Sequence, residues 1–120
     1  MSTTTILDPQ AIDSLRAISP DDGGEFLNEL IDIYLADTPQ RIAEIEQCLA
    51  SQNAGDLTRA AHSIKGSAAN LGAAALRTAA EKLEHHARTQ GLVAVEAFVA
   101  EIGAEFARAE TELKKIIAPH

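Results

Sequence analysis

The chain has 120 residues, 46% of them hydrophobic and 23% charged, which provides for one domain with a single hydrophobic core. Its formal net charge of -8 argues against nucleic acid as a partner, because binding phosphates requires clustered basic side chains. With three Phe, one Tyr and no Trp, the core must be built from Ala, Leu, Ile and Val, and this composition favours helices.

The amino-terminal residues carry no signal for targeting or membrane anchoring. Residues 1–7 lack the basic start and apolar segment of a leader, and no stretch approaches the ~20 apolar residues of a membrane span. We therefore expect residues 1–7 to form a disordered tail and residues 8–118 to form the folded domain. The single Cys48 has no partner for an intramolecular disulfide, and its apolar neighbours indicate a buried thiol in the reducing cytoplasm.

The first helix signal is Asp8-Pro9, a capping residue followed by proline at the first helical position. Apolar residues then recur at helical spacing over a short stretch, which predicts a short first helix. Further along, Asp22 and Glu25 resemble a capping box that opens the next helix.

Pro39 lies inside the long apolar pattern that follows. Its ring clashes with the preceding helical turn and it has no N–H to donate, so an uninterrupted helix is disfavoured there. We expect two helices in this region, with Asp37 or Thr38 as the cap of the second.

The second half of the chain predicts three more helices. Asn53 caps a helix that ends at Leu71, where Gly72 can adopt the left-handed closing conformation. Helical patterns continue over residues 73–90 and 95–116, and no alternating strand pattern occurs in the sequence. The predicted fold is all-α: an antiparallel, up-down-up-down four-helix bundle with one or two short extra helices at the amino terminus.

One predicted helix carries the residues that could take part in a chemical reaction. Its apolar side chains fall on one stripe of a helical wheel, and these are Leu57, Ala61, Ile64, Ala68 and Leu71. His62 lies about 140° from the centre of this stripe and therefore faces solvent. Gly66, one turn later, costs about 1 kcal/mol relative to alanine, which indicates a need for open space beside the imidazole. Lys65 can place its ammonium beside an anion held by the ring.

The segment AHSIKGSAANLGA, residues 61–73, closely resembles the signature of histidine-containing phosphotransfer (HPt) domains. The shared pattern is alanine-histidine, two residues, lysine-glycine-serine, and later leucine-glycine-alanine. The resemblance extends to residues 26–30 and 37–41 and to the pair Leu83-Glu84. It implies a phosphoryl-accepting His62, a neighbouring Lys65, a Glu84 that contacts Nδ1 and leaves Nε2 free, and a clearance and docking surface at Gly66, Ser67 and Ala69.

By this resemblance the chain is a phosphocarrier of a two-component phosphorelay and not an enzyme in the strict sense. It would accept the phosphoryl group from an aspartate of one receiver domain and pass it to another. The expected partners are response-regulator receiver domains and a sensor or hybrid histidine kinase, with the chain itself a monomer. No cofactor is expected in this chain, because Mg²⁺ and most catalytic groups would belong to the receiver domain. No glycine-rich phosphate loop occurs, so the chain should not use ATP by itself.

Two alternatives remain open from the sequence. One is a metal-binding bundle that uses His62 with Glu81, Glu84 or His85, although bundle sites of this kind usually repeat a Glu-x-x-His pair on two helices. The other is a docking module that binds receivers without being phosphorylated.

Two further groups of residues have surroundings that the sequence pattern describes only in part. His85 and His86 point about 100° apart and are expected to be exposed near a helix end. Phe26, Ile33 and Leu35 either form an apolar docking patch beside the histidine or pack into the core.

Overall fold

The computed structural model describes residues 6–18, 21 and 24–117. Within these residues the chain forms five helices and no strand, as the composition predicted. The helices are α1 (Pro9–Ile18), α2 (Glu25–Ser51), α3 (Ala54–Asn70), α4 (Ala74–Gln90) and α5 (Glu96–Ile117). Among the described helices, none combines the length and hydropathy needed to cross a bilayer.

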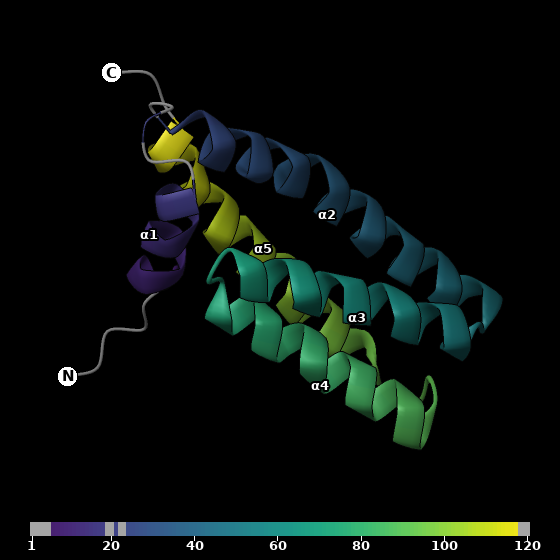
Figure 1. Cartoon of the computed structure of the whole chain (residues 1–120). Coiled ribbons are helices and arrows are strands. Elements are labelled where there is room, and N and C mark those ends of the chain that lie inside the picture. The colour runs from purple at the N-terminus through teal and green to yellow at the C-terminus, as the bar shows by residue number, and fades with distance from the viewer. Residues whose placement is uncertain (1–5, 19–20, 22–23, 118–120) are drawn as a thin grey trace.

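The four long helices form the predicted antiparallel bundle. Contacts join α2 to α3, α3 to α4, α4 to α5 and α5 back to α2, so the four helices close a ring around the core. Successive helices run in opposite directions, and the short α1 packs against α2 (Figure 1). The predicted up-down-up-down bundle with a short extra amino-terminal helix is therefore confirmed.

The helix boundaries follow the capping residues of the sequence. The Asp8 carboxylate accepts a hydrogen bond from the Gln10 N–H at 3.0 Å, and the Asn53 side chain accepts one from the Asp56 N–H at the same distance. Both contacts satisfy amide groups that have no partner within the first turn of a helix. The capping role predicted for Asp22 lies outside the described residues. The predicted tail is described only from Ile6, which is half-buried against the core.

The prediction of two helices around Pro39 is wrong, because α2 continues through the proline without interruption. Thr38 is buried inside the helix, and Asp37 forms an ion pair along it instead of capping a new one. An interior proline costs about 3 kcal/mol. Residues buried on both sides of it, Tyr34 before and Ile45 after, keep both halves of α2 packed on the bundle and outweigh that cost.

The end of α3 is tied to the start of α1. Gly72 has a φ of +73°, and its N–H donates to Ala69 while the Ala73 N–H donates to Ala68, which is the Schellman closure of a helix. The Asp8 N–H donates to the Gly72 carbonyl at 2.8 Å. The predicted glycine closure is confirmed, and it also holds α1 in place.

The core consists mainly of small and branched aliphatic side chains. Its largest fully buried members come from all four bundle helices and the loop before α5: Leu27, Ile31, Ile45, Leu57, Ile64, Leu76, Leu83, Val95, Ile102 and Leu113. Cys48 is buried, as predicted. The aromatic contribution is modest, with the Tyr34 and Phe106 rings 5.9 Å apart between α2 and α5.

Candidate functional site

The site begins with the exposed face of α3. Leu57, Ala61 and Ile64 point into the bundle and fix the rotation of the helix. The His62 side chain on the opposite face is 66% exposed, as the helical wheel predicted. A partner molecule can therefore reach the ring without any movement of the bundle.

Glu84 of α4 lies behind the imidazole. Its side chain is 6% exposed, and Oε2 is 3.0 Å from Nδ1 of His62. An ionised carboxylate can only accept hydrogen bonds, so Nδ1 must carry the proton and donate it. In the neutral ring Nε2 is then unprotonated, with its lone pair directed away from Glu84.

Two cations hold Glu84 in its ionised form. Lys65 Nζ lies 2.8 Å from Oε1, and Arg88 Nη2 lies 2.8 Å from Oε2. Burial alone would raise the pKa of this carboxyl, but the hydrogen bonds from Lys65, Arg88 and His62 outweigh it and lower the pKa to about 2. The carboxylate is therefore charged throughout the physiological range.

The space beside the ring is open. A Cβ atom built on Gly66 would have nothing within 4 Å outside its own helix backbone, so the glycine is not required by internal packing. Ala69 is exposed next to it on the same face, and Ser67 is half-buried. Internal packing thus gives no reason for this mid-helix glycine, and its role as clearance for a partner stays a prediction.

Of the hollows that border α3, two are relevant to the site. One, of about 440 Å³, lies beside the imidazole and is lined by Thr58, Arg59, His62, Ser63, Glu84 and Arg88. The other, of about 220 Å³, is mostly apolar and lies between α1, α2 and α3, lined by Leu15, Leu30, Ile33, Tyr34, Asp37, Ser67, Asn70 and Leu71. Of the predicted apolar patch, only Ile33 is clearly exposed, at 64%, while Phe26 and Leu35 are half-buried.

The remaining histidines of α4 differ from each other. His85 is exposed as predicted, but His86 is not: its Nε2 lies 2.6 Å from the Val93 carbonyl and its ring 4.8 Å from that of Phe98. The loop after α4 folds back over His86, a contact that the sequence pattern could not reveal.

Within the described part of the chain, no group of three His, Cys, Asp or Glu side chains could hold a metal ion.

Of the three residues that contact Glu84, sequence reasoning identified His62 and Lys65 but not Arg88. Its signal was present in the sequence, since it follows Glu84 by four residues and therefore lies one turn further along the same face. The importance of that spacing becomes visible only when α3 and α4 pack side by side (Figure 1).

A helical bundle with an outward imidazole whose tautomer is fixed by a buried carboxylate, and with open space on its outer side, is a carrier of the histidine phosphotransfer type. The sequence model of the Hpt domain family matches residues 29–113. No protein with curated function matched the sequence.

Two solved structures share the fold. Histidine-containing phosphotransfer protein B (HptB) from Pseudomonas aeruginosa PAO1 has a TM-score of 0.85 at 28% identity, covering 95% of this chain and 96% of that one. The HPT domain of the Hpt sensor hybrid histidine kinase from Shewanella has a TM-score of 0.72 at 15% identity, covering 94% of each chain. The chain belongs to the Hpt domain family, whose members carry out histidine phosphotransfer in two-component phosphorelays.

Proposed function

We propose that His62 is the phosphoryl acceptor of this chain and that Nε2 is the attacking atom. The observation that carries the proposal is the contact from Nδ1 to the buried Glu84, because it leaves Nε2 as the bare nitrogen on an exposed face. The phosphoryl group would come from an aspartate of a receiver domain and pass to an aspartate of another.

The neighbouring residues have roles that follow from their positions. Lys65, three residues after His62 and 25% exposed, supplies positive charge beside the phosphoryl group. Gly66 leaves room for the incoming receiver domain, and Ser67 and Ala69 form part of the surface on which it docks.

The chain itself acts as a carrier in this scheme. Catalysis of the transfer is supplied mainly by the receiver domain, which also contributes the Mg²⁺ ion, so this chain needs no cofactor of its own. Its partners are receiver domains and a sensor or hybrid histidine kinase, and it works as a monomer that does not bind nucleic acid. The buried, unpaired Cys48 supports a location in the reducing cytoplasm.

The decisive experiment is transfer of a radiolabelled phosphoryl group from acetyl-phosphate-charged receiver domains. We expect His62→Gln to fold normally and to accept no label, because glutamine has no nucleophilic ring nitrogen. The matched control is His85→Gln, which removes an exposed histidine from α4 and should accept label at the wild-type rate. Label retained in His62→Gln would rule out the assignment.

A further inference from the structure

Arg59 of α3 lies one turn before the proposed acceptor, as Gly66 lies one turn after it. It precedes His62 by three residues, so the two side chains are neighbours on the helix surface. Side chains of a helix lean towards its amino terminus, which places the imidazole over the turn that carries Arg59. Both residues line the hollow of about 440 Å³ beside the ring. The imidazole therefore has an open side at Gly66 and a cationic side at Arg59.

The ion pair that Arg59 forms is a weak one. Its guanidinium contacts the Asp56 carboxylate one turn earlier in α3, and the two side chains are 78% and 47% exposed. An ion pair so exposed contributes little to folding stability, because water and salt screen it. By contrast, Lys65 and Arg88 are each held at 2.8 Å by Glu84, whose side chain is 6% exposed. Of these three cations, Arg59 can therefore change its partner most easily.

The charge around His62 is opposite in sign to that of the whole chain. The formal net charge is -8, whereas the ion pairs around the imidazole contain three cations and two carboxylates. A receiver domain brings carboxylates to this face, because its aspartate carries the phosphoryl group and acidic side chains bind its Mg²⁺ ion. Such a partner is repelled by the molecule as a whole and attracted at this face.

We infer that Arg59 is a specificity-determining residue that leaves Asp56 on docking and pairs with a receiver carboxylate beside the phosphorylated aspartate; this rests on the proposed function. The contact acts on association and not on the reacting atoms. Arg59 therefore affects the receiver concentration needed for transfer and not the rate within the complex. Asp56 competes with the receiver for the guanidinium and weakens docking. The pair selects receivers that carry an acidic side chain at this position.

The two members of the ion pair give opposite predictions. We would measure radiolabel transfer to the intact chain over a range of charged-receiver concentrations at low ionic strength. Arg59→Gln should raise the concentration for half-maximal transfer, KM, by about three- to tenfold and leave the maximal rate unchanged. Arg59→Lys keeps the charge and should stay near the wild-type KM.

Asp56→Asn should lower KM, because it releases the guanidinium and removes a charge that repels the receiver. This variant keeps the backbone N–H that Asn53 caps, so α3 begins at the same residue. A circular dichroism melt of each variant would show that it folds.

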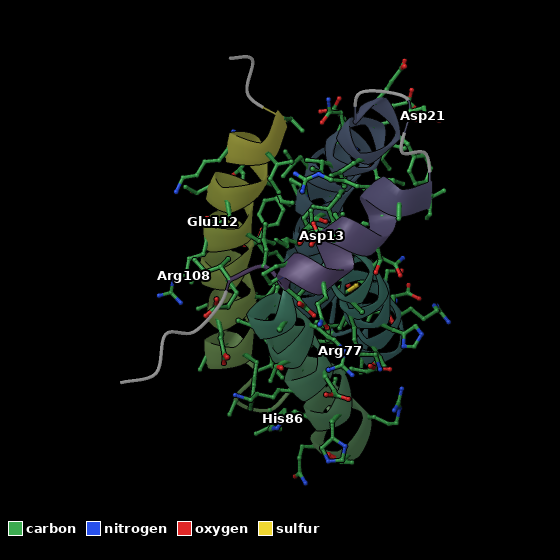
Figure 2. The ribbon with its side chains drawn as sticks, turned by 60° about the vertical axis from the view of Figure 1, so that its left-hand side comes forward. Asp13, Asp21, Arg77, His86, Arg108 and Glu112 are labelled. Atoms are coloured by element: carbon green, nitrogen blue, oxygen red, sulfur yellow. The ribbon has the colours of Figure 1, made fainter. Side chains whose placement is uncertain are left out.

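Added salt gives a second readout. Screening weakens a contact between exposed charges, so the wild-type KM should rise between about 50 and 300 mM NaCl, and that of Arg59→Gln should rise less. The matched control is Arg77→Gln, which removes the same charge from an exposed position of α4 (Figure 2). It should match the wild type in KM and in salt dependence.

Three results would overturn the docking role of Arg59. These are a KM equal to that of the wild type in Arg59→Gln, a loss confined to the maximal rate, and a rise in KM in both Arg59→Gln and Asp56→Asn. The last would mean that the ion pair only supports α3. All three leave the proposed function standing, whereas a wild-type chain that takes up no label from any charged receiver would refute that function itself.

Discussion

The middle and the end of α3 use the same small residue for opposite reasons. Around Gly66, in the middle, a Cβ atom would meet nothing within 4 Å, and the outward face is free for another molecule. At Gly72, just past the end, a Cβ atom would lie 2.8 Å from Ala11 Cβ and 3.0 Å from Asp8, with φ at +73°. The end of the helix therefore contributes to the fold, while the open space at its middle is where we propose that a partner approaches.

The largest expected effect is on the end of the helix. Gly72→Ala introduces both a left-handed alanine and a clash with α1, and should cost about 3 kcal/mol of unfolding free energy. Urea denaturation measures the loss. A cost below about 1 kcal/mol would mean that α1 moves aside freely and that the contrast between the two glycines is smaller than the geometry indicates.

The next largest effect is expected at Gly66, in the middle of α3. Gly66→Gln should slow phosphotransfer from a charged receiver by about a hundredfold, because a long side chain beside His62 prevents close approach of the reacting groups. Stability should not fall, since glutamine is a better helix former than glycine. Wild-type transfer rates in this variant, measured by radiolabel transfer, would refute the clearance argument.

Glu84 of α4 contacts His62 and Lys65 in the middle of α3, and it tests whether these contacts also contribute to stability. Its pKa of about 2 lies below the value of 4.5 expected in the unfolded chain, so the unfolded state binds more protons between these values. The stabilisation is thus complete above about pH 4.5 and is lost as the pH falls towards 2, by at most about 3 kcal/mol. Acid unfolding of Glu84→Gln should show a flatter dependence on pH over this window than the wild type. Identical curves would mean that the buried carboxylate adds nothing to stability.

The smallest expected effect distinguishes the helix propensity of a glycine position from the open space that it leaves beside His62. Gly103 of α5 resembles Gly66, since a Cβ atom there would also meet nothing within 4 Å. Alanine at either position should add up to about 1 kcal/mol to the free energy of unfolding. Only the Gly66→Ala change should slow phosphotransfer; an equal slowing by Gly103→Ala would remove the link between the position of the glycine and its function.

Local signals in the sequence predicted much of this structure. Asp8 and Asn53 cap their helices, Gly72 closes α3, and His62 faces solvent because the buried stripe fixes the rotation of its helix. The resemblance to HPt domains also anticipated the contact between His62 and Glu84, which the structure contains. The chemical roles of these residues stay predictions until transfer is measured.

The errors have a common cause, which is that they depend on contacts between distant residues. The continuity of α2 through Pro39 follows from burial on both sides of the proline, and local sterics say nothing about that burial. His86 is half-buried because the loop after α4 folds back and places the Val93 carbonyl against its ring. Arg88 was missed because neither the motif around His62 nor the Leu83-Glu84 pair includes it, and its contact with Glu84 appears only in the folded structure.

The alignment of His62, Glu84 and Lys65 exists before any partner arrives. If His62 is the acceptor, as we propose, we expect little induced fit in this chain, and the frequency of productive encounters should govern the speed of transfer. A preformed acceptor site cannot by itself distinguish one receiver domain from another. We expect discrimination among receiver domains to come from exposed side chains around the site, such as Ile33.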